Sequence, residues 1–141
     1  MKVRIKKLLD SAVIPMKAHA DDAGFDLVAI SVEEDRKRNI VTYGTGLAFE
    51  IPKGHVGLLF PRSSIYKHQL SLSNCVGVID SCYRGEVSFK FRIEQPHISR
   101  YTIGDRIGQI IIMPYPEVEF EEAQELSETD RGTGGYGSSG K

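Results

Sequence analysis

The chain has 141 residues, 40% of them hydrophobic, and its 18 basic and 19 acidic residues leave a formal net charge of −1. This length suits one domain, and the balanced charge excludes a chain-wide positive field for gripping nucleic acid or an anionic membrane. Because no apolar stretch is long enough to span a bilayer and the basic N-terminus lacks the features of a leader, we expect a cytoplasmic protein, with a nuclear or organellar location also compatible.

Short apolar runs with a period of two predict strands along most of the chain. The runs lie at residues 3–5, 27–30, 45–51, 56–60, 76–79, 87–93 and 107–113. In the run at 87–93, Phe89, Phe91 and Ile93 alternate with polar residues, as a half-exposed antiparallel strand requires. Because turn residues separate the runs, the sequence predicts an all-β fold, a sandwich or barrel of many short strands.

Two segments between these runs have another character. Residues 63–70 predict a short helix, with Ser63 or Ser64 as its cap and with Ile65 and Leu70 turned inward. Residues 33–39 are charged and predict a loop.

The C-terminal part of the chain predicts an arm. Residues 117–130 are acidic and form a connector that can reach a neighbouring subunit, and residues 131–140, RGTGGYGSSG, contain five glycines and no aliphatic side chain. Such a tail buries too little apolar area to order itself, so we expect it to be mobile until it binds a ligand. Its backbone donors, hydroxyls and arginine suit a phosphate, which predicts a β domain at 1–126 and a flexible arm at 127–141.

Two early segments combine charged and hydroxyl residues. In AGFDLVA, residues 23–29, Asp26 lies within an apolar strand, where it faces solvent, accepts bonds from backbone donors or helps to hold a metal ion. In PRSSI, residues 61–65, Arg62, Ser63 and Ser64 precede a predicted helix start and could converge on an anion. A capped helix with a surface arginine explains the second segment equally well.

The segment NCVGVIDSCYRGEV, residues 74–87, predicts a hairpin in which Gly85 lets the chain fold back. Unpaired backbone groups of a hairpin can read the edge of a pyrimidine, and Tyr83 can pack against a sugar and resist an added 2′-hydroxyl. Asp80 could accept a proton from a water molecule beside a phosphate. The alternative is that Asp80 is a turn former and Tyr83 an ordinary strand aromatic.

In GDRIGQIII, residues 104–112, Gln109 lies among apolar neighbours, and a buried amide needs partners. Those partners are either the backbone of an adjacent strand or a phosphate oxygen. The four histidines are scattered without ligand spacing, and Cys75 and Cys82 form neither a disulfide framework nor a zinc pattern.

In this order, the five segments resemble the motifs of the homotrimeric dUTP diphosphatases, the dUTPases. The resemblance covers residues 23–140 and implies a jelly-roll β fold, a trimer with active sites between subunits, and Mg²⁺-dependent hydrolysis of dUTP to dUMP and pyrophosphate. By this resemblance Asp80 activates the attacking water, Tyr83 excludes ribose, and Asp26 supports the metal ion through water. The substrate-binding positions implied are Arg62, Ser63 and Gln109 with Ser64 for the phosphates, Asn74, Gly77, Val78 and Ile79 for uracil, and Arg131, Gly135, Tyr136, Gly137, Ser138 and Ser139 in the arm.

Three departures from the family pattern stand out. Tyr136 occupies the place of a phenylalanine that stacks on uracil, Ser64 and Ile65 replace a common glycine and leucine, and Cys82 replaces a common aspartate close to Asp80. Among rival interpretations, the dCTP deaminases resemble this chain but carry a glutamate about where Lys90 stands, and a lysine is a poor acid or base for that reaction. A silent nucleotide sensor and a structural jelly roll remain as alternatives from other classes.

Overall fold

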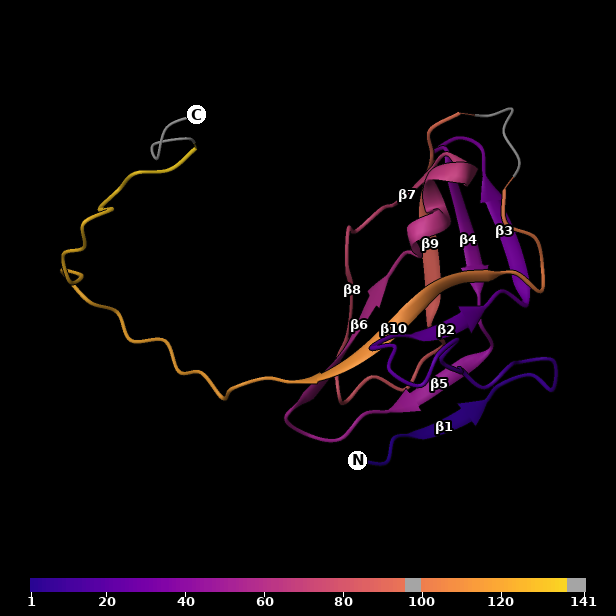
Figure 1. The fold of residues 1–141 in the computed structure, drawn as a ribbon, viewed down its shortest axis with the longest axis horizontal. Helices are drawn as coiled ribbons and strands as arrows, with labels where there is room; N and C mark the ends of the chain where they lie inside the picture. The colour runs from indigo at the N-terminus through magenta and orange to yellow at the C-terminus, as the bar shows by residue number, and fades with distance from the viewer. Residues whose placement is uncertain (96–99, 137–141) are drawn as a thin grey trace.

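The computed structural model describes residues 1–95 and 100–136. Within these residues the chain forms ten strands and one short 3₁₀ helix (Figure 1). The elements are β1 (Arg4–Lys7), β2 (Phe25–Val28), β3 (Ser31–Asp35), β4 (Ile40–Gly44), β5 (Leu47–Glu50), β6 (His55–Phe60), η1 (Ser63–His68), β7 (Leu70–Leu72), β8 (Gly77–Ile79), β9 (Ser88–Ile93) and β10 (Arg106–Pro114).

The strands form three antiparallel sheets. Two four-stranded sheets, β2-β10-β6-β8 and β3-β4-β9-β7, make up the sandwich, and β1 pairs with β5 in a smaller two-stranded sheet. Consecutive strands repeatedly alternate between sheets, and the sheets do not close into a barrel. The predicted all-β class is therefore confirmed, and the fold is a jelly roll.

The core lies between the two large sheets and is rich in aromatic rings. In β9 the burial alternates as predicted, with Phe89, Phe91 and Ile93 buried. Tyr43 of β4 contacts Phe91 edge-on with ring centroids 6.0 Å apart, and its hydroxyl donates a hydrogen bond of 2.9 Å to the carbonyl oxygen of Tyr101. Burial raises the pKa of Tyr43 to about 12, so this buried donor remains protonated at neutral pH.

The predicted charged loop at 33–39 is wrong in its first half. Residues Ser31–Asp35 form β3, which pairs with β4 so that Glu34 lies opposite Val41. This edge strand is mostly exposed, so it carries no apolar alternation, and its order comes from pairing with the well-buried β4. The turn follows and returns through Asn39, which has a φ of 56°.

The prediction for residues 63–70 is confirmed for a helical turn and wrong for its cap and its end. The 3₁₀ helix η1 begins after Arg62, which is the N-cap residue and forms no side-chain capping bond. It ends at Gln69, whose left-handed backbone has a φ of 46°, and Leu70 then begins β7. Ile65 packs against the core and Leu70 is buried, as expected.

The predicted hairpin within residues 74–87 is also wrong. Strand β8 pairs with β6 in one sheet, whereas β9 pairs with β4 and β7 in the other. The rings of Phe89 and Phe91 are buried against β4, which draws β9 away from β8. Residues 80–87 therefore cross from one sheet to the other, with residues 80–86 exposed or half-buried and Val87 buried where the chain enters the second sheet.

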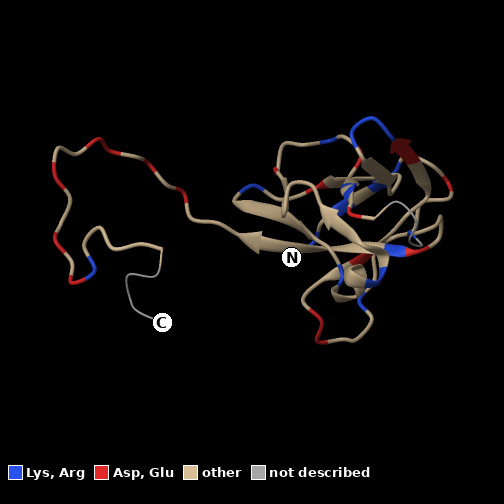
Figure 2. Cartoon of the chain, turned by 90° about the horizontal axis from the view of Figure 1, so that it is seen from above, with Lys and Arg blue, Asp and Glu red and all other residues tan. Residues whose placement is uncertain are grey.

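After β10 the chain leaves the sandwich. Tyr115 donates a backbone hydrogen bond of 3.0 Å to Gly54, and residues 116–136 then run away from the sheets without strand or helix (Figure 1). Acidic residues recur along this segment (Figure 2). A boundary between residues 126 and 127 stays a prediction.

Candidate active site

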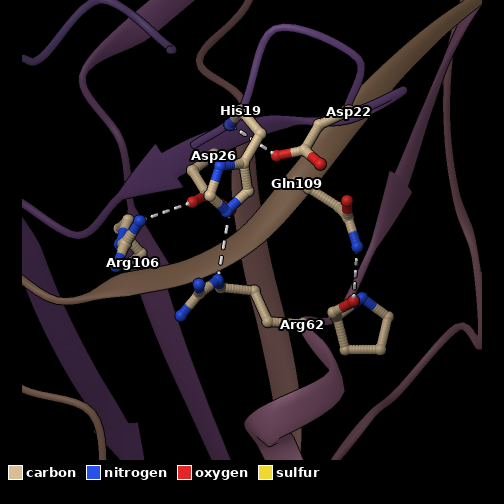
Figure 3. A network of polar contacts seen from close by, with 7 residues as sticks. His19, Asp22, Asp26, Arg62, Arg106 and Gln109 are labelled. Carbon is tan, nitrogen blue, oxygen red and sulfur yellow. Dashed lines mark hydrogen bonds and ion pairs between the residues drawn. The ribbon is translucent and has the colours of Figure 1, made fainter. Parts of the chain in front are cut away.

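Four of the predicted site residues line one cavity. Asp26 comes from β2, Gln109 from β10 and Arg62 from the position just before η1 (Figure 3). Ser63 is the first residue of η1. The cavity has a volume of about 250 Å³, and Asp22 and Gly24 also line it. Segments far apart in the sequence are thus brought together by the pairing of β10 with β2 on one side and β6 on the other.

Both carboxylate oxygens of Asp26 are bound by arginines. Its Oδ1 accepts a hydrogen bond of 3.1 Å from Arg62 Nε, and its Oδ2 accepts one of 3.0 Å from Arg106 Nη1 (Figure 3). This arrangement differs from the solvent and backbone partners that the sequence suggested. The side chain is only 17% exposed, so the two guanidinium groups offset the cost of burying its charge.

The side chain of Gln109 lines the same cavity. Its Nε2 donates a hydrogen bond of 3.2 Å to the carbonyl oxygen of Pro61, which satisfies the expectation of a backbone partner (Figure 3). Its Oε1 lies against Gly24, where an added Cβ would come within 2.1 Å. Gly24 therefore makes room for the amide, a role that the sequence did not reveal.

The oxygen atoms that line this cavity suit a magnesium ion that is held mainly by water molecules and substrate phosphates. Among residues 1–95 and 100–136, no three histidine, cysteine or acidic side chains gather closely enough to cage a metal ion. Mg²⁺ usually keeps several waters and binds one or two carboxylates together with substrate phosphates. Asp26 and Asp22 line the same cavity, and because arginines bind both oxygens of Asp26 and Asp22 Oδ2 accepts a hydrogen bond from His19 N, these carboxylates would reach such an ion through water.

A second cavity contains two of the residues predicted to read a base. Asn74 and Gly77 line a hollow of about 260 Å³ together with Ser73, Ser88 and Lys90. Cys75 has a φ of 60°, and Val76 N donates a hydrogen bond of 2.6 Å to Asn74 O, so the chain turns sharply beside Asn74. Val78 is exposed and Ile79 half-buried on the neighbouring strand β8.

Sequence reasoning missed the contributions of Ser73, Ser88 and Lys90 to this cavity. Alternation in β9 correctly turned Ser88 and Lys90 away from the core. Their proximity to Asn74 follows from the pairing of β7 with β9, and β7 was not predicted as a strand.

Asp80 and Tyr83 lie in the crossing segment that follows β8. Both are exposed, and Tyr83 N donates a hydrogen bond of 3.0 Å to Asp80 O. Arg84 stabilises the same turn, because its Nη1 donates to the carbonyl oxygens of Ser81 at 2.7 Å and Tyr83 at 2.9 Å. The segment thus holds Asp80 and Tyr83 on one tight turn.

The arm residues lie apart from both cavities. Arg131 and Gly134 form local hydrogen bonds with each other, and the side chain of Tyr136 is fully exposed. Gly135 is also exposed, whereas Gly137, Ser138 and Ser139 lie outside the described residues. Ser64 is half-buried on η1. In one chain the predicted site residues therefore fall into three groups: the Asp26 cavity, the Asn74 cavity with its crossing segment, and the arm.

Comparisons with known proteins agree on one family. The family model described as dUTPase matches residues 10–140. The chain is 40% identical to the deoxyuridine 5′-triphosphate nucleotidohydrolase of Nautilia profundicola, over 100% of both chains. It is 43% identical to the protein of the same name in Helicobacter hepaticus, over 99% of this chain and 89% of that one. A solved structure of the Staphylococcus bacteriophage 80alpha dUTPase with dUPNHPP is similar with a TM-score of 0.82, 27% identity and 99% coverage of each chain.

Proposed function

Because the chain belongs to the dUTPase family of hydrolases, we propose that it hydrolyses dUTP to dUMP and pyrophosphate by attack of water on the α-phosphorus. The observation that carries this proposal is the convergence of Asp26, Arg62, Ser63 and Gln109, from distant segments, on one cavity. A guanidinium, a hydroxyl and an amide supply the charge and hydrogen bonds that a triphosphate needs. Phosphoryl transfer requires positioning and neutralisation more than covalent chemistry, so this inventory is sufficient.

In the proposed mechanism Asp80 orients the attacking water and accepts its proton. Asp80 is exposed one residue beyond β8 and is therefore accessible to a water molecule beside a bound phosphate. Asn74 and the backbone of Gly77, Val78 and Ile79 bind uracil, and the ring of Tyr83 packs against deoxyribose. Arg62, Ser63, Ser64 and Gln109 bind the phosphates.

A magnesium ion bound with the triphosphate would neutralise phosphate charge. Asp26 would support that ion through a water ligand. The two arginines on Asp26 keep its carboxylate in the cavity in the free protein.

The arm would close over the substrate and complete the set of donors. Arg131, Gly135, Gly137, Ser138 and Ser139 would bind the terminal phosphate, and Tyr136 would stack on uracil. Closure would also exclude bulk water from the reacting phosphate.

We further propose a homotrimer with active sites between subunits. The three groups of site residues are separate within one chain, and the arm carries exposed apolar side chains at Val118, Phe120 and Leu126. An apolar groove of about 440 Å³ lies beside Val3, Phe25 and Ile112 of the sandwich. An arm from a neighbouring subunit would cover such a groove and bring its own tail to the site.

The proposed cellular role is to limit uracil incorporation into DNA and to supply dUMP for dTMP synthesis in the cytoplasm. Among the described residues, no helix combines the length and apolarity needed to cross a membrane.

Pyrophosphate release from dUTP, dTTP, dCTP and UTP, with and without Mg²⁺, tests the proposal. We expect release from dUTP with Mg²⁺ and little from the others. The Asp80→Asn variant should bind the nucleotide and lose hydrolysis, whereas retained turnover would assign the base to another group. Ammonia release from dCTP would instead indicate a deaminase.

A further inference from the structure

The ring of Tyr83 is fixed on one side and open on the other. Its hydroxyl donates a hydrogen bond of 3.0 Å to Glu86 O, and its ring lies directly on Gly85. A Cβ at Gly85 would come within 2.3 Å of the Tyr83 hydroxyl oxygen and 2.6 Å of Cζ. The residue is 43% exposed, so the surface turned away from Gly85 can receive a ligand.

The side chain of Glu86 ties this segment to the bend between β4 and β5. Its Oε1 accepts a hydrogen bond of 2.8 Å from Gly46 N, and Gly46 has a φ of 65°. Gly44 leaves the space for this carboxylate, because a Cβ there would lie 2.6 Å from Glu86 Oε1. The carboxylate of Glu86 thus lies against the backbone at Gly44 and Gly46, two positions that have no side chain.

The next residue strengthens the same attachment. Val87 N donates a hydrogen bond of 2.9 Å to Leu47 O, and Val87 O accepts one of 2.6 Å from the Thr45 hydroxyl. Thr45 and Val87 are buried. The backbone after Tyr83 is therefore held by the hydrogen bonds of Val87. The Glu86 side chain adds a second attachment close to the Glu86 carbonyl, which accepts the hydrogen bond from Tyr83.

From these contacts we infer that Glu86 is a positioning residue that sets the plane of the Tyr83 ring and thereby the discrimination between deoxyribose and ribose. The inference rests on the proposed function of Tyr83. When Glu86 loses its bond to Gly46, its carbonyl keeps only the support of the neighbouring Val87 backbone bonds, so the acceptor of the tyrosine hydroxyl is held less firmly. A ring that can tilt leaves room for a 2′-hydroxyl and packs less well on deoxyribose.

The test compares kcat/KM for dUTP with kcat/KM for UTP, measured as pyrophosphate release. We expect Glu86→Ala to lower the dUTP/UTP ratio about tenfold, as the loss of one charge-assisted hydrogen bond implies. Glu86→Gln should restore most of the ratio, because the amide oxygen can accept the same bond from Gly46. Glu94→Ala is a matched control, since Glu94 accepts a hydrogen bond from Ser71 elsewhere on the surface, and it should leave the ratio unchanged.

In the Gly85→Ala variant the added methyl group displaces the Tyr83 ring from Gly85, so the dUTP/UTP ratio should also fall. This variant is the alternative test if Glu86→Ala does not fold. An unchanged ratio in folded Glu86→Ala or Gly85→Ala, or an equal loss in Glu86→Gln, would overturn the positioning role. If the wild-type protein hydrolyses dUTP and UTP equally well, the sugar role of Tyr83 fails and this inference fails with it. If the wild-type protein prefers dUTP to UTP and folded Glu86→Ala has the same dUTP/UTP ratio, only the positioning role of Glu86 is overturned.

Discussion

The side-chain oxygen of Gln109 occupies the space in which any residue other than glycine at position 24 would place its Cβ. That Cβ would lie 2.1 Å from Gln109 Oε1 and 2.9 Å from Gln109 Cδ. Because Gln109 Nε2 also donates to Pro61 O, both the nitrogen and the oxygen of its amide are in contact with other parts of the chain. Two residues from separate motifs therefore depend on each other for their positions.

This contact predicts that Gly24→Ala displaces the Gln109 amide and lowers kcat/KM for dUTP by about tenfold, since catalytic groups are sensitive to small misplacement. The free energy of unfolding should change by less than about 1 kcal/mol, because a flexible side chain can move aside. A double-mutant cycle with Gln109→Ala checks the cause. If Gly24→Ala lowers kcat/KM as much in the Gln109→Ala background as in the wild type, the contact between Gly24 and the Gln109 amide does not cause the loss.

The pair of arginines on Asp26 predicts that Asp26→Asn destabilises the protein. The variant leaves Arg62 with a neutral partner, and with Asp26 and Arg62 only 17% and 28% exposed we expect a loss of about 1–2 kcal/mol in the free energy of unfolding. Chemical denaturation measures this loss. The exposed pair of Asp35 with Arg38 is the control, and Asp35→Asn should cost less stability than Asp26→Asn, because ion pairs at the surface are screened by solvent. Equal losses at the two sites would show that burial of the Asp26 pair contributes nothing.

Local patterns in the sequence predicted the elements whose burial alternates and missed those whose order depends on distant partners. The run at 87–93 was predictable because Phe89 and Phe91 alternate with polar residues. Strand β3 was not, because it is an exposed edge strand stabilised by β4. The hairpin prediction failed because Gly85 looks like a turn former, whereas its role in the structure is to admit the Tyr83 ring.

The candidate site was predictable by residue type and not by contact. Local sequence patterns indicate Asp26 and Gln109 separately, and only the resemblance to a family places them in one site. Their proximity follows from the register of β10 on β2, which places Gln109 opposite Asp26. Arg106 binds Asp26 from 80 residues away, and no local pattern carries that pairing. The contact of Glu86 with Gly46 likewise joins residues 40 positions apart, so no local pattern indicates it.

Burial of Tyr43 predicts a loss of stability at high pH. Because burial raises the pKa of Tyr43 to about 12, above its ordinary value of 10.0, the unfolded chain releases this proton at a lower pH than the folded protein does. The contribution is fully present below pH 10 and is lost as pH rises from about 10 to about 12, at up to about 1.4 kcal/mol per pH unit. Denaturation curves at several pH values measure it.

The Tyr43→Phe variant separates this effect from the titration of other groups. It should be less stable at neutral pH by about 1 kcal/mol, since it lacks the bond to Tyr101 O, yet it should lose less stability between pH 10 and pH 12. Some slope will remain, because burial also raises the pKa of Tyr101. The exposed Tyr66→Phe variant is the control, and a slope equal to that of Tyr43→Phe would contradict the assignment.

The separation of the arm from the sandwich predicts that removal of residues 131–141 leaves the fold intact and disables turnover. The hydrogen bonds of Arg131 and Gly134 are made within the arm, so their loss removes no support from the sheets. The unfolding temperature should therefore remain within about 2 °C, as for changes outside the core. Turnover of dUTP should fall at least about a hundredfold, because the truncated protein lacks the donors and the lid proposed for the triphosphate. Full activity after truncation would show that the arm has no part in catalysis.

The Tyr136→Phe variant is the control for the arm. It keeps the ring proposed to stack on uracil and should therefore retain activity.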